Sequence, residues 1–270
     1  MTTGSLKAPG DLSPWVLRVV RLGFLAKGLI YSLIGILAFR LAIGLRGGRL
    51  VDSSGVLHTL MGQPFGQFML AVISIGILGY AAYYVCEAVM DTRHRGGGLN
   101  GWTKRSLTFI KAVTYGTIGI EALRLLAGDR SPAGGPEKTA SIVMLFPLGA
   151  SFLVLVGIGL AIYGMTQLKM TWDCRFDDDL DEARVRREAR WLLMVGRLGI
   201  GARSIILVLM GLTLVWAGIE QRPSNADGYR ESLMTILAQP FGSWLLAAVG
   251  GGLFLFGVFE LAHVKYARVR

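Results

Sequence analysis

The sequence has little charge and few of the side chains on which most enzyme chemistry depends. Charged residues make up 17% of the 270 residues, and there are three histidines and two cysteines. His58, His94 and His263 share no metal-ligand spacing, and the motifs of serine hydrolases, zinc proteases and P-loop proteins are absent. Every aspartate lies outside the apolar stretches, which excludes the paired aspartates of an intramembrane protease. We therefore expect a protein that is not an enzyme and that holds no metal or cofactor.

Charge is missing altogether from four long stretches, at residues 67–86, 139–168, 204–219 and 232–259. The mean hydropathy is +0.52. About 20 helical residues cross the hydrocarbon core of a bilayer, and a helix satisfies all of its own backbone polar groups there. The sequence predicts an all-α integral membrane protein with six transmembrane helices. We expect these helices at 22–44, 67–89, 107–127, 148–168, 198–218 and 243–264.

The basic residues predict the orientation of these helices. Segments on one side of the membrane carry 17 lysines and arginines, and the loops on the other side carry 6. By the positive-inside rule, both termini are cytoplasmic, in a bacterial inner membrane. The net charge of +10 follows from this topology, so no nucleic acid partner is expected. Cys86 and Cys174 fall on the cytoplasmic side, where thiols stay reduced, and we expect no disulfide.

The tetrapeptide Gln-Pro-Phe-Gly occurs at residues 63–66 and again at 239–242. An offset of 176 residues aligns both copies and their flanks without a gap, and a weaker middle copy aligns at offsets of 84 and 83. Such repetition indicates one helical hairpin copied in tandem, and the three parallel copies are expected to pack around a pseudo-threefold axis. The expected segments are a cytoplasmic N-terminal segment (1–18), repeat 1 (19–92), repeat 2 (103–172), a charged cytoplasmic helical linker (173–194) and repeat 3 with the C-terminal tail (195–270).

We call this tetrapeptide the hinge, because it is expected to end one helix and begin the next. Proline suits the first turn of a helix, and the residue before it is pushed out of the helical region. The residues that precede the hinge place apolar side chains at helical spacing, which predicts short interfacial helices on the external face. A re-entrant, pore-lining loop is the alternative. The hinge residues are Gln63, Pro64, Phe65 and Gly66, then Pro147 and Gly149, then Gln239, Pro240, Phe241 and Gly242.

The sequence resembles a bacterial membrane family in four features taken together. These are the Arg-x-Gly opening at Arg21, the tyrosine and glycine two turns further on, the hinge, and the tandem of three hairpins. This family is known as domain of unknown function 1206, and the resemblance covers about residues 21–264. The middle copy departs from the pattern, with Arg-Ser-Leu at 105–107 and Phe-Pro-Leu-Gly at 146–149. The resemblance implies a six-helix membrane protein and no established activity.

Three cations occupy equivalent positions in the repeats: Lys27, Lys111 and Arg203. Each lies six residues past the arginine at the cytoplasmic start of a helix, which is roughly 9 Å deep at the helical rise. Ionisable residues at such depth are costly and are the first candidates for function. One interpretation is that these side chains snorkel back to the headgroups. The other is that they turn inward and form a positive ring that binds an anion or a lipid headgroup.

Two acids are expected to pair with these cations within their own repeats. Glu87 lies at a depth similar to that of Lys27, and Glu260 is placed to serve Arg203. Repeat 2 has no acid at the corresponding depth, so Lys111 is solvated, paired across repeats, or available to an anion.

A further ion pair is expected near the external ends of the helices. Glu121 lies three residues before Arg124 on one helical face, which predicts an i,i+3 pair. A proton relay through Glu121 is the alternative.

We expect a non-enzymatic scaffold or partner subunit of the inner membrane with a membrane or cytoplasmic protein partner, because the loops are short and the helix faces are rich in glycine. The alternative is a device that binds or translocates an anion or a lipid headgroup through the equivalent cations. The lipid bilayer is the environment in both.

Overall fold

The structure, a computed structural model, describes residues 14–90, 99–129, 136–172 and 190–266, and these residues form helices joined by short turns. Long helices alternate with short ones in the same order in each repeat. The prediction of an all-helical protein is therefore confirmed for the described residues. The long helices are α1 (Pro14–Ala42), α3 (Gly66–Met90), α4 (Leu99–Leu126), α6 (Gly149–Trp172), α8 (Arg190–Glu220) and α10 (Gly242–Tyr266), and the short ones are α2 (Ser53–Met61), α5 (Pro136–Met144), the 3-10 helix η1 (Pro223–Asn225) and α9 (Tyr229–Leu237).

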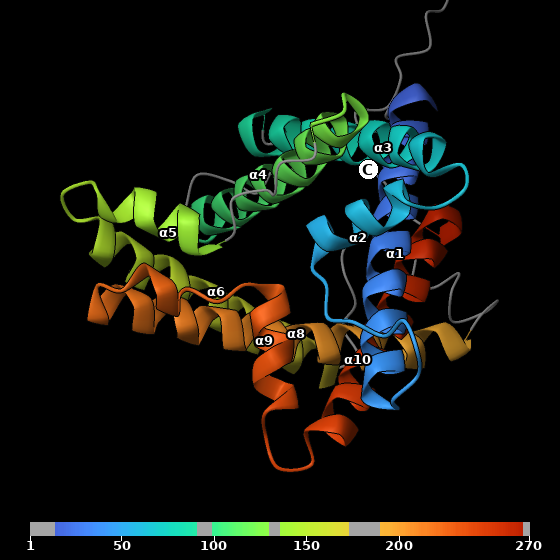
Figure 1. Cartoon of the computed structure of the whole chain (residues 1–270). Helices are drawn as coiled ribbons and strands as arrows, with labels where there is room; N and C mark the ends of the chain where they lie inside the picture. The colour runs from blue at the N-terminus through green and yellow to red at the C-terminus, as the bar shows by residue number, and fades with distance from the viewer. Residues whose placement is uncertain (1–13, 91–98, 130–135, 173–189, 267–270) are drawn as a thin grey trace, which may run out of the picture.

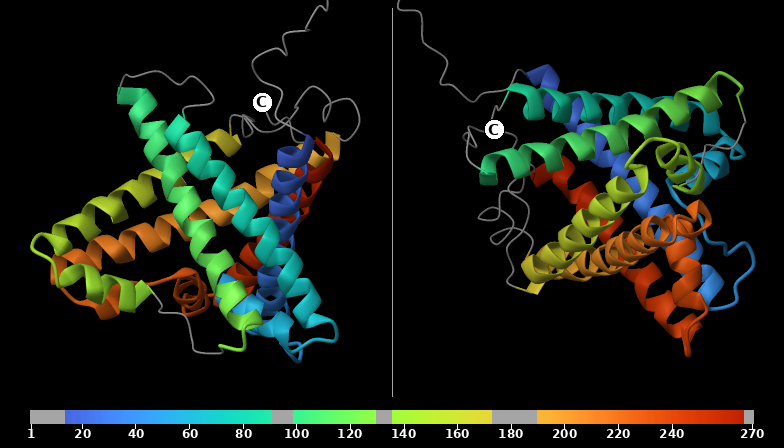
Figure 2. Two further views of the ribbon diagram at one scale, coloured as in Figure 1. Left: turned by 90° about the horizontal axis from the view of Figure 1, so that it is seen from above. Right: turned by 90° about the vertical axis from the view of Figure 1, so that its left-hand side faces the viewer.

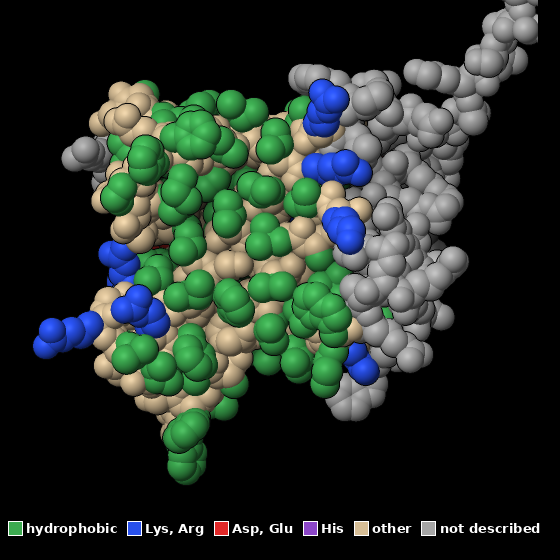
Figure 3. Space-filling model, turned by 90° about the vertical axis from the view of Figure 1, so that its right-hand side faces the viewer, with side chains coloured by type: hydrophobic (Ala, Val, Ile, Leu, Met, Phe, Trp, Pro, Cys, Tyr) green, Lys and Arg blue, Asp and Glu red, His purple; other side chains and the backbone are tan. Residues whose placement is uncertain are grey.

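Five of the long helices are long and apolar enough to cross a membrane. Six were expected, and α4 is the exception because Lys111, Glu121, Arg124 and several threonines lower its hydropathy. On the face drawn in Figure 3, the Lys and Arg side chains lie at two opposite margins and the band between them is mainly hydrophobic. Charge at two margins with an apolar band between them is typical of a membrane protein. Of the expected linker at 173–194, only residues 190–194 are described. Cys174 and His94 lie outside the described residues.

The long helices form three close pairs, α1 with α10, α3 with α4, and α6 with α8, and the pairs cross one another at large angles (Figures 1 and 2). Each pair joins the second helix of one repeat to the first helix of another. Within repeats 1 and 3 the two long helices also pack together, α1 on α3 and α8 on α10. In repeat 2, α4 and α6 have no extensive contact along the described residues. The left view of Figure 2 shows α2, α5 and α9 at one end of the molecule, which we call the hinge end.

The three hinges have the same backbone conformation. Phe65, Leu148 and Phe241, the third hinge residues, have φ values of 62°, 68° and 61°. In each hinge the N–H of the fourth residue donates to the carbonyl of the first, at 2.8–2.9 Å. This is the pattern of a type II turn with proline at its second position, where glycine is usual at the third. The prediction that the hinge joins two helices is correct, but proline belongs to the turn and the long helix begins at the glycine.

The last hinge residue has no room for a side chain. A Cβ built on Gly66, Gly149 or Gly242 would lie 1.9–2.1 Å from a backbone carbonyl oxygen of the preceding short helix. Glycine is therefore required there by the close approach of two backbones, in addition to any requirement of the turn.

The short helices are confirmed as helices, and their apolar faces are buried against the bundle. Val56, Leu57 and Leu60 of α2 are buried, as are Leu233 and Ile236 of α9. The apolar spacing that predicted an interfacial helix is thus explained by packing on the long helices.

The arginines that open repeats 2 and 3 bind the end of the preceding repeat. Arg105 donates from Nε to the Ala88 carbonyl at 2.9 Å, and Arg197 donates from Nε to the Thr171 carbonyl at 3.1 Å. Ala88 and Thr171 are themselves repeat-equivalent and lie in the last turns of α3 and α6. A cation there satisfies free carbonyls and interacts favourably with the helix dipole. Each of these hydrogen bonds joins the start of one repeat to the end of the preceding repeat.

Candidate functional site

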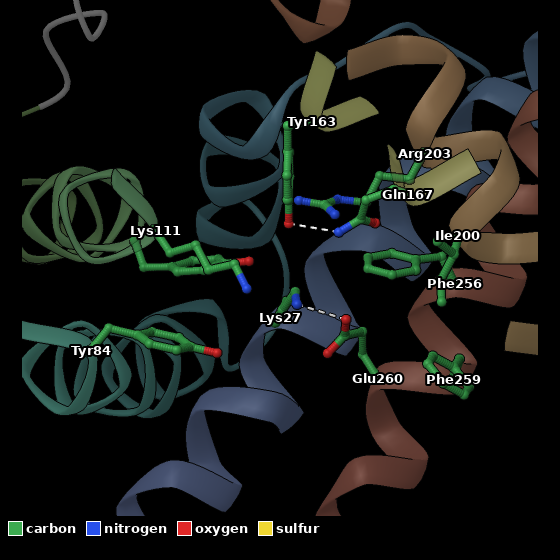
Figure 4. A pocket seen from close by; sticks show the side chains of 11 residues that line it. Lys27, Tyr84, Lys111, Tyr163, Gln167, Ile200, Arg203, Phe256, Phe259 and Glu260 are labelled. Atoms are coloured by element: carbon green, nitrogen blue, oxygen red, sulfur yellow. Dashed lines mark hydrogen bonds and ion pairs between the residues drawn. The ribbon is translucent and has the colours of Figure 1, made fainter. Parts of the chain in front are cut away.

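One pocket contains all three repeat-equivalent cations, and we call it the cation pocket (Figure 4). Its cavity volume is about 30 Å³. That is enough for about two waters, since one water needs roughly 10–15 Å³. Helices from all three repeats contribute to it, and Figure 4 shows the labelled side chains converging on one space. The lining residues are Lys27, Tyr84, Lys111, Tyr115, Tyr163, Gln167, Ile200, Arg203, Phe256, Phe259 and Glu260.

A second repeat-equivalent set surrounds the cations. The offsets that align the hinges also align Tyr84 with Gln167 and Glu260, and all three line the cation pocket. The offsets likewise align Tyr80 with Tyr163 and Phe256. The Tyr80 and Tyr84 hydroxyls are hydrogen-bonded at 2.8 Å, and Gln167 Nε2 donates to the Tyr163 hydroxyl at 2.6 Å, so the first two repeats share this contact. Two helical positions, those of Lys27 and Tyr84 in repeat 1, therefore line the pocket in all three repeats.

Lys27 forms an ion pair with Glu260, with 2.6 Å between Nζ and Oε1. The two side chains are 10% and 6% exposed. We expected Glu260 to pair with Arg203 and Glu87 to pair with Lys27, each within its own repeat. The Glu260 assignment is wrong because α10 packs closely on α1, which brings Glu260 of repeat 3 beside Lys27 of repeat 1. Glu87 is buried but is not among the lining residues.

Arg203 is held by aromatic rings. Its guanidinium carbon lies 5.7 Å from the centre of the Tyr31 ring and 5.2 Å from that of Phe256, and Nε donates to the Tyr31 hydroxyl at a long 3.4 Å. Within the described part of the chain, no carboxylate lies at ion-pair distance from Arg203. The guanidinium has five N–H donors and keeps its charge in proteins, so it offers further donors to the pocket.

Tyr229 of α9 extends this aromatic group toward the hinge end. Its ring lies edge-on to Tyr31, with centroids 6.0 Å apart. Burial raises the pKa of the Tyr229 hydroxyl well above its ordinary value. This hydroxyl has no hydrogen-bond partner among the described residues.

The cations also lie over rings of neighbouring repeats. Lys27 Nζ is 5.6 Å from the centre of the Tyr115 ring in repeat 2, and Lys111 Nζ is 5.7 Å from that of Tyr84 in repeat 1. Cation–π contacts of this kind hold a desolvated cation without neutralising it. The interpretation in which the three side chains snorkel separately to the headgroups is therefore not what the structure shows, since all three point into one shared space.

The acids and cations of the hinge end pair differently from the prediction. Arg124 forms an ion pair with Asp129 at 2.6 Å, and Glu121 accepts a hydrogen bond from the Ser54 hydroxyl of α2. The expected pair between Glu121 and Arg124 is not the observed one. Arg124 lies in the last turn of α4. It pairs with Asp129, which follows the end of the helix, and not with Glu121, which lies one turn before it.

A family described as "Domain of Unknown Function (DUF1206)" matches residues 22–91, 108–172 and 198–267. The three matched segments cover more than half of the chain. The chain belongs to the DUF1206 family. This confirms the resemblance drawn from the hinge and the Arg-x-Gly opening.

This DUF1206 chain is similar to the uncharacterized protein YxxB of Bacillus subtilis (strain 168). The two are 30% identical over 261 residues, which cover 96% of this chain and 94% of the relative. No solved structure matches the DUF1206 chain significantly.

Sequence reasoning found the three cations of this DUF1206 protein and missed most of the other residues around them. Tyr84, Gln167 and Glu260 are unlike in chemistry, so a comparison of residue types does not connect them. Their equivalence in position was nevertheless available from the offsets of 83 and 176 that the hinges define.

Proposed function

We propose that this protein binds an anionic group in the cation pocket, without carrying out chemistry on it. The observation that carries the proposal is Arg203, a permanent charge in a partly buried site that has ring contacts, one long hydrogen bond and no carboxylate partner among the described residues. An anion that accepts hydrogen bonds from the guanidinium would satisfy the donors that remain.

The charge of the lining supports the same proposal. Three lining side chains are cationic and one, Glu260, is acidic. A positive site between low-dielectric walls attracts anions more strongly than the same charges in water. The described lining has no serine, cysteine or histidine and no second carboxylate, which is the basis for proposing binding and not catalysis.

The cavity volume limits the group that binds. About 30 Å³ holds one small anion, or the oxygens of one phosphate or carboxylate at the end of a larger molecule. A free anion and a lipid headgroup share this chemistry. The scaffold hypothesis has no comparable observation in its favour.

The proposed setting is a bacterial cytoplasmic (inner) membrane with both termini in the cytoplasm. The bacterial relative and the basic residues on alternate loops support this. A reporter fused to the C-terminus that is active only outside the cytoplasm is expected to be inactive.

We also propose α4 as a sixth membrane span in an approximately threefold arrangement. Large apolar side chains are exposed along α4, among them Phe109, Ile110, Val113 and Ile120. The three equivalent helix pairs, α1 with α10, α3 with α4 and α6 with α8, support the threefold arrangement.

The test is stabilisation by an anion. Inorganic phosphate is titrated into purified protein in a neutral detergent, and the free energy of unfolding is measured. A ligand at 100 times its Kd adds about 2.7 kcal/mol. The stabilisation is expected in the wild type, lost in Arg203→Ala, and kept in the matched control Arg124→Ala, which removes an arginine at the hinge end.

Two results would overturn the proposal. Equal stabilisation of wild type and Arg203→Ala would place the phosphate elsewhere. No stabilisation of the wild type by phosphate, with a protein partner retained whether or not Arg203 is present, would support the scaffold instead.

A further inference from the structure

Among its described residues, repeat 2 lacks the contact that closes the other two repeats. In repeat 1 a Cβ on Gly76 of α3 would lie 2.7 Å from the Leu22 carbonyl oxygen of α1, and in repeat 3 a Cβ on Gly252 of α10 would lie 2.3 Å from Ala202 Cβ of α8. The equivalent residue of α6 is Gly159. No atom of the described residues lies within 4 Å of a Cβ built there. The interface that is tight in two repeats is therefore open in the third.

The sequence of repeat 2 also differs from that of the other two repeats at this interface. Gly23 and Gly199, which begin the tight interfaces, leave no space for a side chain: a Cβ would lie 2.5 Å from Tyr80 and 2.4 Å from Phe256, respectively. Repeat 2 has Leu107 at the same position. The glycine that makes the close contact in repeats 1 and 3 is therefore missing from the sequence of repeat 2.

The cation pocket lies where this opening meets the centre of the molecule. Lys111 reaches the pocket from α4, and Tyr163 and Gln167 reach it from α6 (Figure 4). Tyr115 of α4 also lines the pocket. Along the described residues, α4 and α6 are the two long helices of one repeat that have no extensive contact with each other. Both helices also carry exposed apolar side chains, such as Val113 on α4 and Leu155 on α6.

We propose that the anionic group in the cation pocket is the headgroup of an anionic phospholipid, which enters sideways between α4 and α6 and leaves its acyl chains in that opening. The inference rests on the proposed function, because it requires anion binding at Arg203. Charge and polarity support this ligand. The cations match a phosphate, and the apolar side chains exposed on α4 and α6 match hydrocarbon. Within the described part of the chain, no other interface between the two long helices of a repeat combines both.

The test separates the headgroup site from the route into it. Protein is reconstituted in phosphatidylcholine vesicles that contain phosphatidylglycerol, then extracted in mild detergent, and retained phosphatidylglycerol is counted by native mass spectrometry. Stabilisation by inorganic phosphate is measured in parallel. Gly159→Leu fills the opening, and the matched control is Gly251→Leu on α10, where a Cβ would have its nearest neighbour, Phe39, at an ordinary 3.9 Å.

The wild type and Gly251→Leu are expected to retain phosphatidylglycerol and to respond to phosphate. Gly159→Leu is expected to retain at most about one tenth of the lipid that the wild type retains. It should keep the stabilisation by phosphate, and that response would also show that the variant is folded. Arg203→Ala is expected to lose both.

Full retention of phosphatidylglycerol by Gly159→Leu would overturn the sideways route and leave anion binding intact. Retention of the lipid by Arg203→Ala would place the lipid outside the cation pocket. Phosphate binding without any lipid retained by the wild type would identify a free anion as the ligand, and failure of both in the wild type would refute the proposed function itself.

Discussion

The buried ion pair between Lys27 and Glu260 provides the sharpest test of how the cation pocket is held together. Replacing either residue leaves the other charge buried without its partner, and breaking a buried pair in this way costs roughly 3–5 kcal/mol. Replacing both with apolar residues removes the pair and the cost of burying it. We therefore expect Lys27→Met/Glu260→Leu to be more stable than the worse of the two single variants.

The two single variants are expected to differ, because the charges around them differ. Lys27→Met leaves Glu260 in a pocket that still contains Lys111 and Arg203, so its charge remains balanced. Glu260→Leu leaves three cations with no acid in the described lining. The loss of Glu260 should therefore be the more destabilising change, by roughly 1–2 kcal/mol at partly screened distances.

A second ion pair of the same length is the control. Arg124 and Asp129 are also 2.6 Å apart, but their side chains are 53% and 39% exposed. Exposed pairs contribute roughly 0.2–1 kcal/mol, while the coupling between Lys27 and Glu260 should be about 2–3 kcal/mol. Unfolding in mixed micelles titrated with SDS measures both double-mutant cycles. If the two couplings are equal, or if Lys27→Met is the worse single variant, the account of the pocket is wrong.

Three further predictions concern the hinges and the helix ends, and the same unfolding titration measures each. Gly242→Ala should lose roughly 2 kcal/mol or more, because its Cβ would lie 1.9 Å from a carbonyl oxygen, and an unchanged stability would contradict the packing described. Phe241→Gly should gain about 1 kcal/mol by relieving the left-handed conformation, whereas Phe241→Val should lose stability. Arg197→Met should lose about 1 kcal/mol with the hydrogen bond to the end of α6, and Arg230→Met is the neutral comparison.

The repeated sequence predicts the local structure of this chain well, because local structure depends on neighbouring residues. Gln-Pro-Phe-Gly contains the proline that a turn requires and the glycine that two close backbones require, so the hinges are found where expected. Phe241 in a left-handed conformation was not predictable from propensity, since glycine or asparagine is usual there. Tertiary packing on either side of the hinge imposes that conformation.

Partners across repeats are harder to predict, because an offset aligns repeats without saying which faces meet. Glu260 was assigned to Arg203 on the assumption that each hairpin pairs its own charges. The observed partner is Lys27, since the second helix of one repeat packs on the first helix of the next. Depth in the membrane, which is what the sequence gives, is the same for both cations and cannot distinguish them.

Position 84 of repeat 1 and its equivalents show how three copies of one hairpin produce one asymmetric site. The copies hold Tyr84, Gln167 and Glu260 there, while the neighbouring cationic position is filled in all three. Three acids would neutralise the three cations, and no acid would leave them to repel one another in a low-dielectric space. The single acid of the described lining balances one lysine, and Arg203 has no carboxylate partner among the described residues. The same copy that supplies Gln167 also replaces a closing glycine with Leu107, so the second repeat departs from the pattern both where charge is set and where the helices would close. The proposed binding of an anion thus depends on the divergence of the repeats at these two positions, and not on the hairpin that they share.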